Sequence, residues 1–543
     1  MNFLTRFLTR LRIKAISREV ARAESLRDLQ RTAMHRHAGK PALTTPAVRL
    51  TYREMEDRTL RLVAAWRAAG IRKGSRVVVL LPDEWPQLIV RFAATESGAV
   101  LVGFNPAHSA ALMSRAMDDL APDLLMIDLA LMPEGFAAQH AAASGAPIWN
   151  CGLGGDLEAK LAAVDPGLSD ERIGMDDTLA LGFTSGTSGV PKMVALKHAP
   201  YLHSVRLLLL NLTDPPRDRS RTLVGIPLSG AGSGLVLPTM LSGGQLILPR
   251  AYTADALIET LRAERPSHVF LTPSLMIDLL DHPALTTDDM ACLQQVIYGS
   301  ASMPVAKLKE AIARFGLIFQ QGYGMSEALP PISMLAPAEH VDDGLPPEAS
   351  VLSSSGRVAR GVGLQVRRED HSIADTGEIG RVWVQSPTVF EGYVNRPDLN
   401  DEVLRDNWYC SGDYGYFDAS ERIHVLDRQQ NLIDRPEGRI YPRMVEERAH
   451  ECRHVKEAAL VQARGQVWLC VSLRRDSRGL DPAAVEREVR DHLASLLLSW
   501  QCPDRMLILD ELPRSFLAKL LHREVRERIE SGAIESSAIG SDA

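Results

Sequence analysis

In the first half of this chain, apolar runs typical of buried strands alternate with stretches that have the pattern of helices. The apolar runs at residues 76–82 (RVVVLLP) and 98–106 (GAVLVGFNP) follow an amphipathic stretch at 55–70, and similar runs recur at 123–128 and 268–274. Runs of Val, Leu and Ile without strict alternation are typical of strands that helices cover on both faces. The pattern therefore predicts an α/β fold with mostly parallel sheets.

The pattern of predicted secondary structure changes in the second half of the sequence. From Gly356 to Asp427 short β-type runs stand between Gly, Asn and Asp turns, which predicts a small β-rich subdomain. A smaller α+β segment follows, with strands expected around 459–473 and helices at 483–498 and 520–530. Because 543 residues exceed what one core accommodates, we expect four parts: a basic N-terminal helix (1–24), a large core domain (25–427), a small C-terminal domain (428–530) and a loose tail (531–543).

Composition excludes several classes of protein. The net charge of -7 gives no overall basic field, so nucleic acid is not an expected partner. The six cysteines contain no C-x-x-C pair, which argues against zinc and a disulfide framework and fits a reducing cytoplasm. No window of 18 uncharged apolar residues occurs, so no transmembrane helix is expected.

The first twenty residues form a predicted basic amphipathic helix. Arg6, Arg10, Arg12 and Lys14 precede the first acid, Glu19, and apolar residues stand between them at helical spacing. Arginines every few positions argue against a signal peptide. Two interpretations stay open: a helix packed on its own protein, or peripheral contact with anionic lipid through residues 1–20, which would make a cytoplasmic protein membrane-associated.

A glycine- and hydroxyl-rich segment at 179–192 (LALGFTSGTSGVPK) carries the strongest chemical signal. Glycines let the backbone approach an anion, and hydroxyls and main-chain N–H groups can bind phosphate oxygens. It is not the G-x-x-x-x-G-K-[ST] loop, because Met193 follows the lysine. The candidate phosphate-binding residues are Thr184, Ser185, Gly186, Thr187, Ser188, Gly189 and Lys192.

This segment resembles the phosphate loop of the adenylate-forming superfamily, which includes AMP-dependent acyl- and aryl-CoA synthetases. Four further segments resemble that family's motifs in the expected order, at 298–304 (YGSASMP), 320–328 (QQGYGMSEA), 408–418 (WYCSGDYGYFD) and 513–519 (PRSFLAK). The resemblance covers about residues 25 to 530. It implies a mobile C-terminal lid domain over the large core.

The middle two motifs imply adenine and magnesium sites. Gly299, Ser300 and Ala301 stand where the family has its adenine loop. In the 320–328 segment, the resemblance implies that Tyr323 stacks on adenine beside Gly324, that Ser326 lies near the α-phosphate, and that Glu327 binds Mg²⁺. Mg²⁺ prefers one or two carboxylates together with phosphate oxygens, which fits a single glutamate.

The later motifs imply the ribose site, the hinge and the catalytic lysine. By resemblance, Asp413 and Arg428 bind the ribose hydroxyls, Asn431 stands at the hinge, and Lys519 is the catalytic lysine. A carboxylate that accepts two hydrogen bonds suits a vicinal diol. The expected activity is therefore ATP- and Mg²⁺-dependent conversion of a carboxylic acid, a fatty acid or another acid that is not an amino acid, to an acyl-adenylate. Transfer to a thiol follows, with coenzyme A as the expected acceptor.

Three departures from the family pattern qualify this expectation. Met193 replaces a usual glycine, with a small expected effect. Ser229 and Gly230 replace an aromatic residue and a histidine beside the acyl pocket, and no aspartate follows to pair with an amino group, which disfavours an α-amino acid.

The loop at 434–438 (DRPEG) lacks the paired glycines of CoA ligases. A proline fixes φ, and an acid there would repel the phosphates of CoA, so adenylation is better supported than thioester formation.

Two alternatives therefore remain beside the CoA ligase. One is a ligase that passes the acyl group to a carrier protein, an amine or an internal hydroxyl. The other is a non-catalytic protein that binds nucleotide or acyl ligand. The presence of Glu327, Asp413, Arg428 and Lys519 together disfavours the second.

Overall fold

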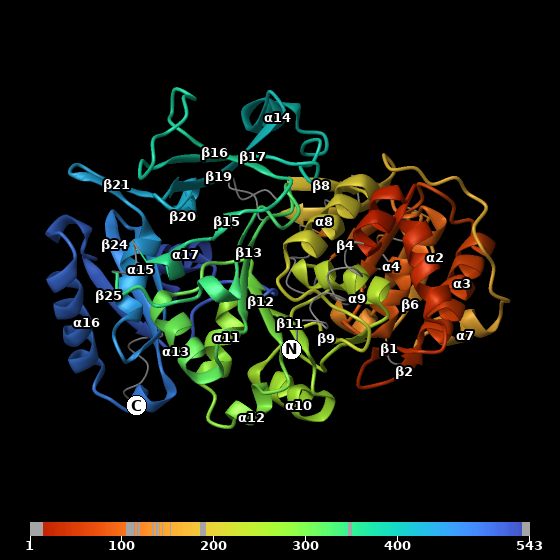
Figure 1. Ribbon diagram of the computed structural model, residues 1–543, viewed down its shortest axis with the longest axis horizontal. Coiled ribbons are helices and arrows are strands. Elements are labelled where there is room, and N and C mark those ends of the chain that lie inside the picture. The colour runs from red at the N-terminus through yellow and green to blue at the C-terminus, as the bar shows by residue number, and fades with distance from the viewer. Residues whose placement is uncertain are drawn as a thin grey trace.

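The structure is a computed structural model of the 543-residue chain. It describes residues 15–104, 113–114, 117, 120–132, 135–136, 140, 142–143, 145–152, 154–184, 192–345 and 350–534. Figure 1 shows the N-terminal part at the right, the central strands β11 to β13 in the middle, a β-rich layer above them, and the C-terminal part at the left.

A six-stranded sheet forms the N-terminal part, in the order β6-β5-β3-β4-β7-β8. All of its pairings are parallel except that of β7 with β8. Its strands are β3 (Arg76–Leu80), β4 (Val100–Gly103), β5 (Leu124–Ile127), β6 (Ile148–Asn150), β7 (Thr178–Thr184) and β8 (Lys192–Lys197). Its helices are α2 (Leu26–Arg36), α3 (Tyr52–Ala68), α4 (Trp85–Ser97), α7 (Leu157–Ala162) and α8 (His198–Asn211).

A nine-stranded sheet lies at the centre, in the order β15-β14-β13-β12-β11-β9-β10-β1-β2. Its middle is parallel from β1 to β13, and antiparallel strands close both edges. Its strands are β1 (Pro41–Thr44), β2 (Arg49–Thr51), β9 (Arg221–Leu223), β10 (Gln245–Ile247), β11 (His268–Leu271), β12 (Gln295–Gly299), β13 (Phe319–Tyr323), β14 (Ser333–Leu335) and β15 (Arg357–Val358). The helices are α9 (Val236–Ser242), α10 (Ala254–Glu264), α11 (Pro273–Leu280), α12 (Thr287–Met290) and α13 (Val305–Phe315). The sequence prediction of an α/β fold with mostly parallel sheets is confirmed.

Turn-rich residues after 356 form a five-stranded antiparallel sheet, as the sequence predicted. Its elements are β16 (Gly363–Arg367), β17 (Gly380–Gln385), α14 (Pro397–Val403), β18 (Leu404–Arg405), β19 (Trp408–Phe417) and β20 (Ile423–Arg428). The pairing of β19 with β20 sets Asp413 directly opposite Arg428. This register matters because both residues are ribose-site candidates.

The C-terminal segment, residues 428–534, has cores of its own. Two hydrophobic clusters consist of residues between Ile433 and Ile534 and include no buried residue from the rest of the chain. Its elements are β21 (Ile433–Arg435), β22 (Gly438–Ile440), α15 (Pro442–His450), β23 (Val455–Ala463), β24 (Gln466–Leu473), α16 (Pro482–Leu496), β25 (Arg505–Leu509) and α17 (His522–Ser531). The domain boundary at Asp427 and the mobility of this segment stay predictions.

The helix expected at 483–498 ends two residues earlier than its apolar run predicts. Leu493 is fully buried, whereas Leu496 and Leu498 are 43% and 60% exposed. The run therefore loses its buried face at Leu496, and tertiary packing no longer supports the helix there.

The predicted N-terminal helix is only partly described. Residues 1–14, which carry its basic side chains, lie outside the described residues. Residues 15–22 are helical; there Val20 is buried in the main core and Glu19 pairs with Arg36 on α2. The described part thus packs on its own protein. Among the described residues, no helix is long and apolar enough to cross a membrane.

Candidate active site

The carboxyl ends of β12 and β13 bring two predicted motifs to one edge of the central sheet. Parallel strands place the residues that follow them side by side. Gly299 ends β12, and a Cβ there would lie 2.3 Å from the carbonyl oxygen of Gly322 on β13. Only glycine permits this approach. Ser300 follows with a left-handed φ of 71°, and Ala301 is exposed beyond it.

Tyr323, Asp413 and Arg428 meet as one hydrogen-bonded cluster. The Tyr323 hydroxyl donates to Oδ2 of Asp413, and Nε of Arg428 lies 3.3 Å from the other carboxylate oxygen. Asp413 is only 3% exposed, so these two partners, rather than water, stabilise its negative charge. Burial and the neighbouring carboxylate raise the pKa of Tyr323 well above its ordinary value, and Asp413 raises the pKa of Arg428. The sequence motifs placed these three residues separately, and the structure joins them.

Glu327 is held by a tyrosine that the sequence reasoning missed. The Tyr393 hydroxyl donates to Oε1 of Glu327 at 3.0 Å. The ammonium nitrogen of Lys192 lies 4.7 Å from the centre of the same Tyr393 ring, which is a cation–π distance. Tyr393 therefore joins the end of the phosphate-loop motif to the candidate magnesium ligand. Its only sequence signal was a Gly-Tyr pair in a turn-rich stretch, which carries no chemistry by itself.

Lys519 stands on a tight loop that reaches this cluster. The Ser515 N–H donates to the Lys519 carbonyl at 2.7 Å, and the Lys519 N–H donates to Oγ of Ser515 at 3.1 Å. Burial, together with the charge of Arg428, lowers the pKa of Lys519 to about 8, although the charge of Glu327 opposes the shift. The lysine is therefore within electrostatic reach of both groups.

The tip of the lysine loop rests on the segment that departs from the family pattern. A Cβ on Gly230 would lie 2.8 Å from a methyl carbon of Leu517. The absence of a side chain at position 230 thus makes room for the loop. Ala518 has a left-handed φ of 54°, a conformation that favours glycine, so the loop is held in a costly backbone state.

The structure describes only some of the remaining predicted residues. Residues 185–191, and with them the predicted Ser185, Gly186, Thr187, Ser188 and Gly189, lie outside the described part of the chain, as does the side chain of Thr184. Gly324 approaches Pro330 so closely that a Cβ would lie 2.6 Å from its ring. Ser326 is exposed in the turn before Glu327. Met193 packs against the core cluster beneath β3 and β5, so that departure is accommodated as expected.

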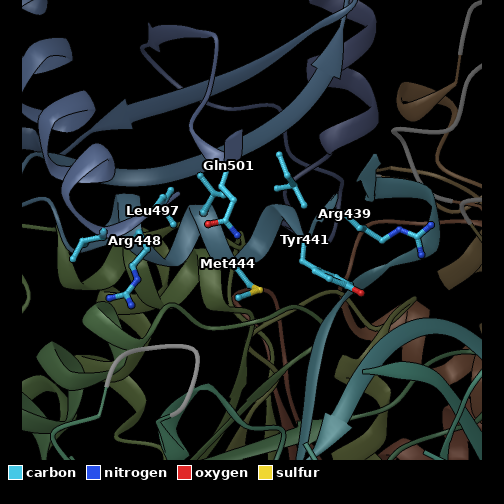
Figure 2. A pocket seen from close by; sticks show the side chains of 9 residues that line it. Arg439, Tyr441, Met444, Arg448, Leu497 and Gln501 are labelled. Carbon is cyan, nitrogen blue, oxygen red and sulfur yellow. The ribbon is translucent and has the colours of Figure 1, made fainter. Parts of the chain in front are cut away.

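The unusual loop at 434–438 forms the turn of the β21–β22 hairpin. Asp434 pairs with Arg439 across the hairpin, with 2.7 Å between Oδ1 and Nε. Trp500 covers Gly438, since a Cβ there would lie 3.1 Å from its indole. Of the two acids on the loop, Asp434 therefore has a cation beside it, which weakens the argument that this acid repels an anionic acceptor. A cavity of about 110 Å³ opens beside this hairpin (Figure 2). None of the predicted site residues lines it. Its walls include Arg439, Tyr441, Met444, Arg448, Leu497 and Gln501.

Comparisons with known proteins identify the class. Residues 29–394 match the family model of the AMP-binding enzymes. A feruloyl-CoA synthase from Amycolatopsis sp is 31% identical over 92% of this chain and 98% of its own. The medium/long-chain-fatty-acid–CoA ligase FadD8 of Mycobacterium tuberculosis is 29% identical over 92% and 89%. The solved structure of the amide bond synthetase McbA from Marinactinospora thermotolerans superposes with a TM-score of 0.80 at 26% identity, covering 93% and 99%.

The chain thus belongs to the AMP-binding, adenylate-forming family of enzymes. It is an AMP-forming acid–thiol ligase of the acyl-CoA synthetase kind.

Tyr393→Phe should weaken adenylation without unfolding the protein. Removing a hydrogen bond to a carboxylate costs about 1.5–3 kcal/mol, so we expect pyrophosphate exchange to fall by roughly tenfold or more. The matched control is Tyr414→Phe, which removes a tyrosine bond to Glu369 outside the cluster. Equal losses in the two variants would show that Tyr393 does not act through Glu327.

The lowered pKa of Lys519 predicts a pH dependence. The ammonium form is charged below about pH 8 and loses its charge as pH rises through that value. Since kcat/KM reports the free enzyme, kcat/KM for ATP in pyrophosphate exchange should fall above about pH 8. In Lys519→Arg the guanidinium stays charged, so any residual activity should lack this fall. The same alkaline fall in both proteins would assign the titration to another group.

Proposed function

We propose that the cluster around Asp413, Glu327 and Lys519 binds Mg·ATP beside a carboxylic acid without an α-amino group, and forms its acyl-adenylate. The observation that carries this proposal is the position of Lys519. The loop of the C-terminal segment that carries Lys519 rests through Leu517 on Gly230 of the core, and the charge of Lys519 interacts with those of Arg428 and Glu327. Arg428 in turn contacts Asp413. Donor, carboxylate and cation thus converge where a nucleotide's ribose and phosphates would meet.

Each side chain has a role that its surroundings support. The Asp413 carboxylate would exchange its bond from Tyr323 for bonds from the ribose hydroxyls, with Arg428 alongside. Tyr323 would offer its ring to adenine at the end of β13, beside the loop of Gly299, Ser300 and Ala301. Thr184 to Gly189 and Lys192 would hold the β- and γ-phosphates, with Ser326 near the α-phosphate.

Glu327 fits a magnesium ion that is held mostly by phosphates. Tyr393 occupies one carboxylate oxygen, and the described residues contain no group of three acidic, histidine or cysteine side chains that could hold a metal alone. A site with one protein carboxylate is the arrangement Mg²⁺ favours with nucleotide phosphates. When bound, the ion would neutralise phosphate charge. Tyr393 would orient Glu327 for it.

In the adenylation step a carboxylate oxygen of the acid attacks the α-phosphorus, and the bond to pyrophosphate breaks. Lys519 neutralises the negative charge that builds on the phosphates, and the protein contributes position and charge without covalent chemistry. In the transfer step a thiolate attacks the acyl carbon, and AMP leaves with the bonding electrons. We propose coenzyme A as the thiol.

Lys519→Ala should separate the two half-reactions. Loss of a preorganised charge contact costs on the order of 10²-fold or more, so pyrophosphate exchange should fall by that amount. Thioester formation from supplied acyl-adenylate should stay near normal, because the pyrophosphate whose charge Lys519 neutralises has already left. Equal loss in both steps would contradict the assigned role. A wild-type protein that exchanges pyrophosphate with no aryl, short-chain, long-chain or hydroxylated acid would instead support a non-catalytic binding protein.

The acceptor is a separate question, because the similar amide bond synthetase is named for an amide product. The Asp434–Arg439 pair favours CoA here by offsetting the acid on the hairpin. With the best acid, CoA consumption should match AMP release one for one. AMP release without loss of CoA thiol, with an amide formed from an added amine, would support the alternative acceptor. A third arm with a carrier-protein thiol completes the comparison.

A further inference from the structure

Four charged side chains meet where the C-terminal segment docks on the core. Asp278 of α11 accepts from Nη1 of Arg514 at 2.5 Å and from Nη2 at 3.1 Å, and Nζ of Lys456 lies 2.7 Å from its Oδ1. Arg514 also donates to Glu457 through Nε at 3.2 Å. Ser274, one helical turn before Asp278, donates to Glu457 at 2.9 Å. All four charged side chains are at most 22% exposed.

The charges balance only when the segment is docked. Lys456, Glu457 and Arg514 all belong to the C-terminal segment and together carry one net positive charge, from two cations and one acid. Asp278 supplies the missing negative charge from the core. Burial raises the pKa of Asp278, but its bonds to Arg514 and Lys456 lower it below its ordinary value, so this carboxyl is ionised in the docked state. A partly buried cation without a partner is costly, which favours this docked position.

Arg514 also stands at the base of the loop that carries Lys519. Arg514 pairs with Leu520 in an isolated β-bridge, and the Leu521 N–H donates to the Pro513 carbonyl at 2.9 Å. The loop between them is closed at its base, and its tip rests on Gly230. Fixing Arg514 against α11 therefore fixes where Lys519 lies.

We infer that Asp278 is a positioning residue that selects the docked orientation used for adenylation; the inference rests on the proposed function. Asp278 acts through Arg514 and has no place among the nucleotide-site residues. Glu457 contacts Arg514 from within the segment, so when the segment leaves the core the base of the lysine loop keeps this contact and loses the one with Asp278. Asp278 is the one residue of these four that belongs to the core. It is therefore the charged partner that Arg514 and Lys456 lose when the segment leaves its docked position.

Other contacts across this interface hold the segment without touching the loop. Arg474 pairs with Glu310 of α13 at 2.8 Å, and Nζ of Lys307 donates to the Val455 carbonyl at 2.9 Å. Glu310→Gln thus removes one acid from the same interface and from the same kind of bidentate arginine pair. It is the matched control for Asp278→Asn.

The test measures both half-reactions in Asp278→Asn, Asp278→Glu and Glu310→Gln. We expect Asp278→Asn to lower kcat for pyrophosphate exchange by on the order of tenfold, within the usual range of coupling between sites, while KM for ATP changes little. Acyl transfer from supplied acyl-adenylate should be unchanged or faster, since that step does not need the docked loop. Asp278→Glu should recover most of the exchange rate. Glu310→Gln should lose clearly less than Asp278→Asn.

A readout without catalysis separates failure of this inference from failure of the proposed function. Hydrogen–deuterium exchange in the full-length protein should quicken at residues 455–457 and 513–521 in Asp278→Asn, with the core strands unchanged. Slower transfer and slower adenylation by equal factors, equal effects of Asp278→Asn and Glu310→Gln, or unchanged protection at 513–521 would each overturn the inference. If wild-type protein lacks pyrophosphate exchange but Asp278→Asn still loosens 513–521, the docking role stands and the proposed function fails.

Discussion

The docking of the C-terminal segment on α11 and α13 is the contact on which the candidate active site depends. The core by itself brings Tyr323, Asp413 and Glu327 to one edge of the central sheet, whereas Lys519 comes from the C-terminal segment. That lysine is almost two hundred residues from Glu327 along the chain. Packing of β23 and the 513–521 loop against the core closes this distance. If the segment moves as the sequence predicts, this cation would leave with it, which would give one site two states for two half-reactions.

Opposed charges organise the site before any substrate arrives. Asp413 is nearly inaccessible and is held by Tyr323 and Arg428, and Glu327 is oriented by Tyr393. The positive charge of Arg428 repels Lys519, and the negative charge of Glu327 attracts it. A polyphosphate bound near these two cations would offset the repulsion between them.

Glycines and small residues decide which surfaces can meet. Gly299 allows β12 to approach β13, and Gly230 accepts Leu517 from the lysine loop. The sequence marked the second position only as a departure from the family pattern. Its consequence became visible when a residue nearly three hundred positions later was found against it. In the hairpin at 434–438, the sequence did not show that Arg439 pairs with Asp434, and the fold does.

The sequence by itself determined the α/β class, the β-rich layer after Gly356, and the candidates Lys192, Glu327, Asp413, Arg428 and Lys519. Those depend on local hydrophobic patterns and short motifs, which are properties of neighbouring residues. Only the tertiary structure decided that Tyr393 contacts Glu327, that Leu517 rests on Gly230, and that Asp278 pairs with Arg514 and Lys456. Each of these is a contact between distant segments. Strand register and domain docking set such contacts, and no local pattern records them.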